Sequence, residues 1–194
     1  MQSNVQQRGA VKFPQFLGER VYMREFTKSG GLPKDLERWQ GTIDQMLDGI
    51  DAPGSIFLMI DQAEVKAGAS HRRGGVHVDG YWDKALRAHG GGHRGGHIIG
   101  EAYEPEALIL ATDVMASYAY IGEYDDAPGS GGDCAHIDVS GMLCTDIEPG
   151  KVWAGHTLTF LHEAMPVAKD CKRTLVRLNI PGWVPNGTEL TGTP

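Results

Sequence analysis

Two histidines and one aspartate of this chain are able to bind a metal ion together. His77 and Asp79 stand two residues apart, and on an extended strand their side chains would point to the same face. His162 comes much later in the sequence and would supply a third ligand from a distant strand. Two imidazoles and one carboxylate on one face of a metal hold non-heme Fe(II) and leave coordination positions open. The sequence therefore predicts a metal site made of these three residues.

A second pair with the same spacing, His136 and Asp138, shows that the motif alone is weak. We favour His77 because glycines frame it in a short strand that opens into a loop. His136 also leaves too few residues before His162 for the strands that would have to lie between two ligands. His136 could instead line the site or occupy a Gly-rich turn.

Two arginines follow His162 on the next predicted strand. Positions 173, 175, 177 and 179 alternate with the other residues of this strand, so Arg173 and Arg177 would share one face. Buried cations without anions are costly, and a guanidinium matches a carboxylate in a bidentate manner. Inward-pointing arginines therefore predict an acidic ligand or partner.

In order and type, these elements resemble the Fe(II)- and 2-oxoglutarate-dependent dioxygenases, from His77 to the end of the arginine strand. The resemblance implies a double-stranded β-helix (jelly roll) in which His77, Asp79 and His162 hold Fe(II). It implies 2-oxoglutarate as co-substrate and O2 as oxidant, with decarboxylation to succinate and CO2 and hydroxylation of an unknown substrate. The protein would be a non-heme iron hydroxylase.

The resemblance also implies that Arg173 binds the far carboxylate of 2-oxoglutarate. Arg177 would then contact the substrate or the other end of the co-substrate. Many members of the family carry Ser or Thr two residues after the first arginine, but this chain has Leu175 there. The choice between Arg173 and Arg177 as the anchor stays open at this point.

The elements that must position these residues follow from periodicity. Residues 33–50 place apolar side chains at helical spacing, with Pro33 suited to the first turn. The rest of the chain has short apolar runs separated by Gly, Pro and Asp clusters. The predicted strands are Ser55–Val65, His97–Tyr103, Ala107–Ala111, Ser117–Ile121, Lys151–Trp153, Leu158–Leu161 and Thr174–Ile180.

Many short strands after one helix predict a mainly β fold, a jelly roll with an N-terminal helical buttress. The length of 194 residues fits a single domain over 1–194. The net charge of -7 gives no reason to expect a nucleic-acid partner. No apolar run is long enough to span a membrane, so we expect a cytoplasmic protein with no membrane partner. The oligomeric state is not readable.

The segment from His89 to His97 is rich in glycine and histidine. It could form a flap that closes over the substrate, or a connector that binds metal only adventitiously. His156 is a rival ligand near His162, but its Gly-flanked position predicts a loop. The substrate could be a small molecule or a protein side chain, and Arg72, Arg73 and Arg94 favour an anionic one.

Two other classes of function remain. A cupin-like metal protein, such as an isomerase or ligand-binding module without oxygen chemistry, would use the histidines without needing the arginine pair. The usual cupin pattern of HxH with a following Glu is absent around His77 and His162. In a non-catalytic β-sandwich binding module, the histidines would be structural only, and removal of His77 would leave the function intact.

Overall fold

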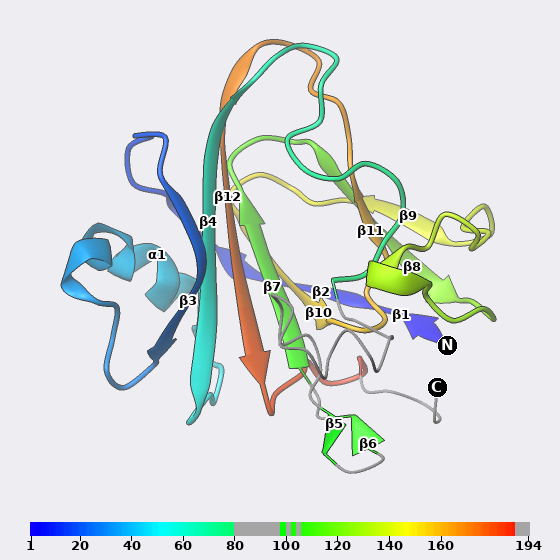
Figure 1. Cartoon of the computed structure of the whole chain (residues 1–194), viewed down its shortest axis with the longest axis horizontal. Helices are drawn as coiled ribbons and strands as arrows, with labels where there is room; N and C mark the ends of the chain where they lie inside the picture. Colours follow the sequence, from blue (N-terminus) through cyan, green and yellow to red (C-terminus); the bar gives the residue numbers. More distant parts are fainter. Residues whose placement is uncertain (80–97, 100–101, 104–105, 189–194) are drawn as a thin grey trace.

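The computed structural model describes residues 1–79, 98–99, 102–103 and 106–188 (Figure 1). The strands are β1 (Gln2–Ser3), β2 (Val5–Ala10), β3 (Arg20–Thr27), β4 (Ser55–Val65), β5 (Ile98–Ile99), β6 (Ala102–Tyr103), β7 (Glu106–Thr112), β8 (Ser117–Glu123), β9 (Leu143–Asp146), β10 (Lys151–His156), β11 (His162–Ala164) and β12 (Cys171–Pro181). The helices are α1 (Gln40–Met46) and the 3-10 helices η1 (Lys34–Trp39) and η2 (Ser130–Gly132). The predicted Gly/His loop from His89 to His97, with Arg94, lies outside the described residues.

The larger sheet is antiparallel and has the strand order β2-β10-β7-β12-β4-β3. Its central strands β4, β7 and β12 are buried along nearly their whole length. Both faces of the sheet are therefore covered, which explains why these strands are nearly continuous apolar runs rather than alternating ones.

One face of the larger sheet carries the helical buttress. Trp39 and Ile43 are fully buried and belong to the same apolar cluster as Val176 and Leu178 of β12. The predicted helix over 33–50 is confirmed as an amphipathic element, although it is divided into the 3-10 helix η1 and the α-helix α1. Its predicted apolar positions are all buried: Leu36, Trp39, Ile43, Met46, Leu47 and Ile50.

The smaller antiparallel sheet lies against the other face. Its strand β8 pairs with β9 along one side, and with β11 and β1 at opposite ends of the other side. Apolar side chains such as Leu108, Leu110, Trp153 and Phe160 form a second core cluster with Ala119 of β8. The fold is thus mainly β, with two antiparallel sheets as in a jelly roll and a small helical buttress. Figure 1 shows the helix and the smaller sheet on opposite sides of the larger sheet.

The sequence predictions were wrong at several places. Within the predicted strand His97–Tyr103, the described residues form two short strands, β5 and β6, that pair with each other, and β9 was not predicted. Leu158–Leu161 is not a strand, because the amide N–H groups of Thr159 and Phe160 both donate to the carbonyl of His156 and close a turn; β11 begins at His162. The N-terminal strands β1, β2 and β3 were not predicted at all. β2 and β3 are edge strands with largely exposed side chains, and they lack the apolar pattern from which strands are recognised.

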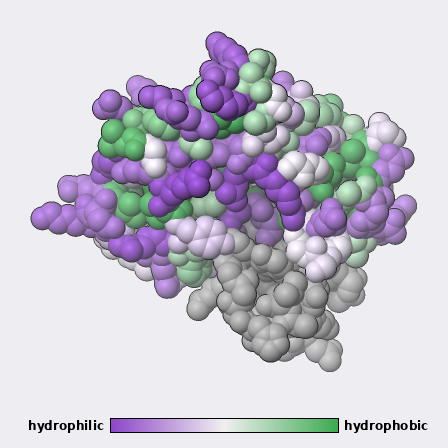
Figure 2. Space-filling view, turned by 45° about the horizontal axis from the view of Figure 1, so that its top comes forward, coloured by the Kyte–Doolittle hydropathy of each residue, from purple (hydrophilic) through white to green (hydrophobic). Residues whose placement is uncertain are grey.

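Two surface properties are relevant to function. None of the helices described is long and apolar enough to cross a membrane. On the face shown in Figure 2, hydrophobic residues are scattered among hydrophilic ones. The large apolar side chains that are most exposed are Leu17, Tyr22, Met115 and Leu143.

Gly155 in β10 offers a test of how tightly the core supports β11. A Cβ atom at this position would lie 2.9 Å from Cγ of Phe160 and 3.0 Å from the carbonyl oxygen of Asn4. Gly155→Ala should therefore lower the free energy of unfolding by about 1–3 kcal/mol, measured by urea denaturation.

The matched control is Gly9→Ala in β2, where no atom lies within 4 Å of the added Cβ. This variant should be as stable as the wild type or slightly more stable. Equal stability of both variants would contradict the close packing described for Gly155.

Candidate metal centre

The two predicted histidine ligands are neighbours in an antiparallel pairing. The N–H of His77 donates to the carbonyl of His162 at 2.9 Å, and the N–H of His162 donates to the carbonyl of His77 at 3.0 Å. His77 also bridges to Asp133 on its other side. The predicted strand around His77 is therefore reduced to a single bridged residue, which still fixes the segment beside β11.

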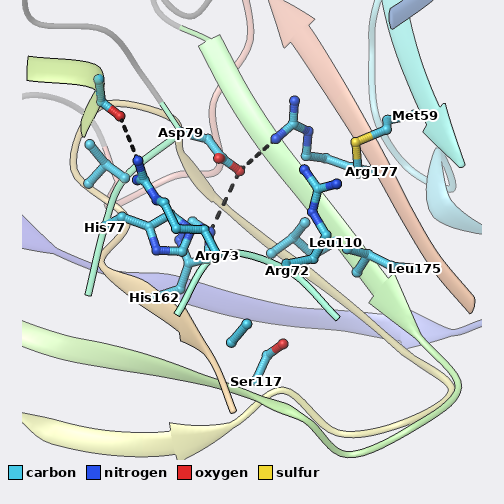
Figure 3. A pocket seen from close by; sticks show the side chains of 13 residues that line it. Met59, Arg72, Arg73, His77, Asp79, Leu110, Ser117, His162, Leu175 and Arg177 are labelled. Carbon is cyan, nitrogen blue, oxygen red and sulfur yellow. Dashed lines mark hydrogen bonds and ion pairs between the residues drawn. The ribbon is translucent and has the colours of Figure 1, made fainter. Parts of the chain in front are cut away.

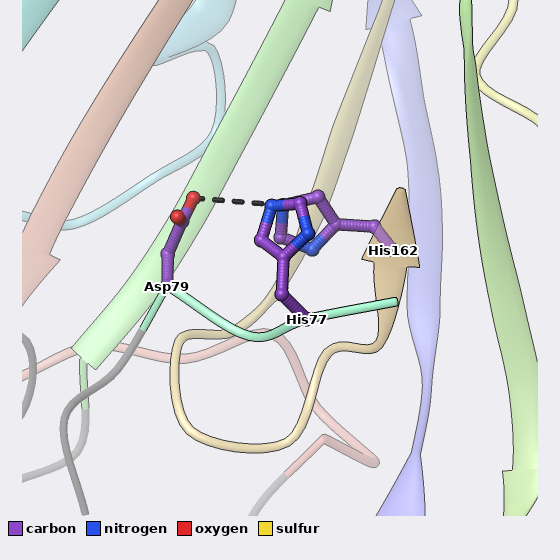
Figure 4. Close-up of side chains that lie close together, drawn as sticks. All are labelled: His77, Asp79 and His162. Atoms are coloured by element: carbon purple, nitrogen blue, oxygen red, sulfur yellow. Dashed lines mark ion pairs between the residues drawn. The ribbon is translucent and has the colours of Figure 1, made fainter. Parts of the chain in front are cut away.

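This pairing brings the side chains of His77, Asp79 and His162 together (Figure 4). One ligand atom of each residue lies within 4.8 Å of the others, and Nε2 of His162 is 3.6 Å from Oδ2 of Asp79. The imidazole centroids are 4.4 Å apart. Among the described residues, this is the one group of three or more His, Cys, Asp or Glu side chains close enough to hold a metal ion.

Hydrogen bonds define which nitrogen of each imidazole faces the cluster. Nδ1 of His77 lies 2.7 Å from the carbonyl oxygen of Gly75, and Nδ1 of His162 lies 3.0 Å from that of Phe160. A carbonyl oxygen can only accept, so each Nδ1 carries a proton, and Nε2 of each ring is the nitrogen left for a metal ion. Metal-binding histidines are oriented in this way in proteins.

The charges of the cluster also suit a metal. Burial, with a smaller contribution from His162, lowers the pKa of His77 to about 3, so its imidazole is neutral at neutral pH. Burial acts to raise the pKa of Asp79, but Arg177 and His162 outweigh it and hold the pKa well below its usual value. The site therefore offers the neutral imidazole of His77 and the ionised carboxylate of Asp79 beside the ring of His162.

Arg177 of β12 pairs with the carboxylate of this cluster. Its Nη1 lies 2.9 Å from Oδ2 of Asp79, and both side chains are largely shielded from solvent. Its Nη2 contacts the sulfur of Met23 at 3.7 Å. Met23 has a φ of 47° and lies between Val21 and Arg24, where the β3–β4 pairing shifts register. The bulge turns this side chain toward the site.

Arg173 is fully buried on the same strand. Its Nε donates to Oγ1 of Thr112 at 3.2 Å and its Nη2 donates to Oγ of Ser117 at 2.9 Å. Its Nη1 is buried and has no hydrogen-bond partner among the described residues. A buried guanidinium with an unused donor is a costly arrangement that an anionic ligand would relieve.

The metal-ligand cluster and Arg177 line a pocket of about 220 Å³ between the two sheets, and Arg173 is not among its lining residues (Figure 3). Leu175 and Arg177 line it from β12, which agrees with the predicted inward face of that strand, and Ser117 links it to Arg173. The pocket is lined by Met59, Arg72, Arg73, His77, Val78, Asp79, Leu110, Ser117, Gly131, His162, Ala164, Leu175 and Arg177.

The rival residues lie elsewhere. His136 is exposed, with its Nε2 3.0 Å from the carbonyl of Ala127, and Asp138 accepts the N–H of Ser140 in a turn. His156 is buried, and its Nδ1 accepts the N–H of Leu158 at 3.1 Å. None of the three lines the pocket or belongs to the metal-ligand cluster.

Sequence reasoning missed several residues that build the site. The carbonyls of Gly75 and Phe160 orient the histidines, and the hydroxyls of Thr112 and Ser117 orient Arg173. Every residue has a backbone carbonyl, so residue types do not reveal which carbonyls will orient a side chain. Ser117 could have been found, because it begins a predicted strand next to a turn and is polar.

Comparisons with known proteins find similarity among solved structures alone. No protein-family model and no curated protein matches the chain. Among solved structures, the chain is similar to EvdO2 from Micromonospora carbonacea var. aurantiaca complexed with 2-oxoglutarate, with a TM-score of 0.42 and 13% identity over 87% of this chain and 71% of that one. A structure of EvdO2 described without that ligand has a TM-score of 0.41 and 14% identity over the same shares.

The low pKa of His77 predicts a pH dependence of stability in the metal-free protein. The unfolded chain takes up a proton near pH 6.5, whereas folded His77 does so only near pH 3. Between these values the unfolded state binds more protons, so the free energy of unfolding falls as the pH is lowered from 6.5 toward 3.

Urea denaturation across this range should show a weaker pH dependence for His77→Asn than for the wild type. His136→Asn, which removes an exposed histidine, should behave like the wild type. If His77→Asn keeps the full pH dependence, His77 does not have the depressed pKa described here.

Proposed function

We propose that the protein is an Fe(II)- and 2-oxoglutarate-dependent dioxygenase that hydroxylates a substrate while 2-oxoglutarate is decarboxylated to succinate and CO2. The observation that carries this proposal is the cluster of His77, Asp79 and His162 at a pocket between the sheets. The bound iron would supply the activation of oxygen. The protein's own residues would bind, orient and exclude water.

The donor set fits Fe(II). Each Nδ1 bonds to a backbone carbonyl, which leaves both Nε2 atoms for a metal ion beside the Asp79 carboxylate, and three protein ligands leave positions open for a chelating 2-oxo acid and for oxygen. A structural zinc site would have a fourth protein ligand, and none lies close enough among the described residues. The arrangement therefore favours a metal site with open positions for small-molecule ligands over a structural metal site.

We assign the far carboxylate of 2-oxoglutarate to Arg173 rather than Arg177. Arg173 has a buried Nη1 without a partner, and its Ser117 neighbour lines the pocket. Arg177 already has an anionic partner in Asp79. In this proposal Arg177 orients a metal ligand and keeps it ionised, and Arg173 binds the co-substrate.

A cupin-like protein without oxygen chemistry would also use the metal cluster. It would not account for the buried guanidinium of Arg173, whose unused donor faces no described acceptor. The alternative therefore explains fewer features of the site than the dioxygenase does.

The proposal predicts a visible metal-to-ligand charge-transfer band when anaerobic protein receives Fe(II) and 2-oxoglutarate. The band should be lost in His77→Ala and His162→Ala, because each change removes a ligand. The matched control His136→Ala should keep the band at wild-type intensity, since this exposed residue lies outside the cluster. A missing band in the wild type, or a band that survives both ligand changes, would show that the proposed function is wrong.

The two arginines should differ in what their removal weakens. Arg173→Ala should reduce the affinity for 2-oxoglutarate by about 10–100-fold, the effect of losing a charge-assisted hydrogen bond, with Fe(II) affinity little changed. Arg177→Ala should mainly weaken Fe(II) binding, because Asp79 loses its cationic partner.

Both affinities can be measured by titration of the charge-transfer band, with circular dichroism to confirm that each variant is folded. The variants Arg173→Lys and Arg177→Lys keep the charge and serve as a second pair if an alanine variant is unstable. The assignment is reversed if Arg177 variants lose 2-oxoglutarate affinity and Arg173 variants do not.

A further inference from the structure

We infer that the substrate is a small anionic molecule, and that Arg73 together with Arg72 binds its negative group. This inference rests on the proposed function, because it concerns the room that the metal and the co-substrate leave in the same pocket. Arg72 and Arg73 are consecutive residues of the segment that leads into His77, and both line the pocket (Figure 3).

The residues that line the pocket carry more positive charge than negative charge. Its lining contains three guanidinium groups, those of Arg72, Arg73 and Arg177, against the single carboxylate of Asp79. A divalent metal and the two carboxylates of 2-oxoglutarate have opposite charges of equal size. Their binding therefore leaves the excess in place, and a third ligand with a negative group would reduce it.

Arg72 is held in position by Asp61 of β4. Its Nη1 lies 2.9 Å from Oδ2 of this carboxylate, and the same carboxylate is 3.2 Å from Nε2 of His71 and 3.4 Å from Nε of Arg20. Burial lowers the pKa of His71, so Asp61 is shared between two cationic groups, the guanidiniums of Arg72 and Arg20. Arg72 is fixed at the pocket while part of its charge stays available to a ligand.

The positive charge of Arg73 is compensated even less than that of Arg72. Its Nη1 donates to the carbonyl of Gly131 at 3.2 Å, a neutral acceptor, and no described carboxylate lies within ion-pair distance. The other nitrogen atoms of its guanidinium can therefore donate to a ligand without breaking an ion pair. The bond to Gly131 restricts the side chain, so less conformational entropy is lost when a ligand binds.

The size of the pocket limits the part of a substrate that can enter beside the metal and the co-substrate. Among the described residues its volume is about 220 Å³. Pockets that enclose drug-sized ligands usually have about 300–1,000 Å³. A pocket of this size that must also contain 2-oxoglutarate has room for a compact anion.

Matched acid and amide pairs test the charge preference directly. Butyrate against butyramide, and phenylacetate against phenylacetamide, differ in charge and hardly in size. Each probe is titrated by calorimetry into anaerobic protein loaded with Fe(II) and 2-oxoglutarate, and in parallel into metal-free protein. Persistence of the charge-transfer band during the first titration shows that the acid does not displace 2-oxoglutarate.

In at least one pair the acid should bind the wild type about tenfold or more tightly than the amide, the effect of a charge-assisted hydrogen bond. Arg73→Gln and Arg72→Gln should each reduce this preference to threefold or less, about 0.7 kcal/mol. The control Arg8→Gln, an exposed arginine outside this pocket, should keep it.

The inference is overturned if acid and amide bind equally, if the preference survives both substitutions, or if no probe binds. These failures are separable from failure of the proposed function. A band with no acid preference would leave the dioxygenase in place and remove the anionic substrate. An acid preference in metal-free protein that depends on Arg73, without any band, would support the anion site and remove the dioxygenase.

Discussion

The candidate site depends on the reciprocal backbone hydrogen bonds between His77 and His162. These bonds fix the distance between two ligands that come from remote parts of the sequence, and they do so without using either side chain. Nδ1 of each imidazole can therefore donate to the backbone carbonyl two residues before it. The distance between the two histidines follows from one short stretch of β pairing, and the Nδ1 bonds then determine which ring nitrogen is left for a ligand.

The second constraint is electrostatic and joins the two sheets. The inward face of β12 buries Arg173 and Arg177, and a buried cation without compensation is costly. Arg177 is compensated by Asp79, whereas Arg173 has only hydroxyl partners and an unused donor in the described structure. The same fold therefore holds one arginine that is paired with a carboxylate and one that keeps an unpartnered buried donor.

Much of this could be predicted from residue types and periodicity. The amphipathic element over 33–50 follows from helical spacing and is present in the structure. Alternation predicts that Leu175 and Arg177 share a face, and both line the pocket, while His77 and not His136 lies in the cluster of possible ligands. The prediction of a strand at Leu158–Leu161 was wrong because short apolar runs occur both in buried turns and in strands. The choice between Arg173 and Arg177 depended on partners such as Ser117 and Asp79, and no sequence pattern reveals which distant side chains will meet.

The pairing of Asp79 with Arg177 has a consequence for how the protein is made. In small zinc domains the metal drives folding, because the ligands repel one another or remain unsatisfied without it. Here the carboxylate has a cationic partner and both Nδ1 atoms are bonded to carbonyls of the chain itself. The three side chains are therefore held in place by protein contacts alone, so the fold does not depend on an ion to bring them together.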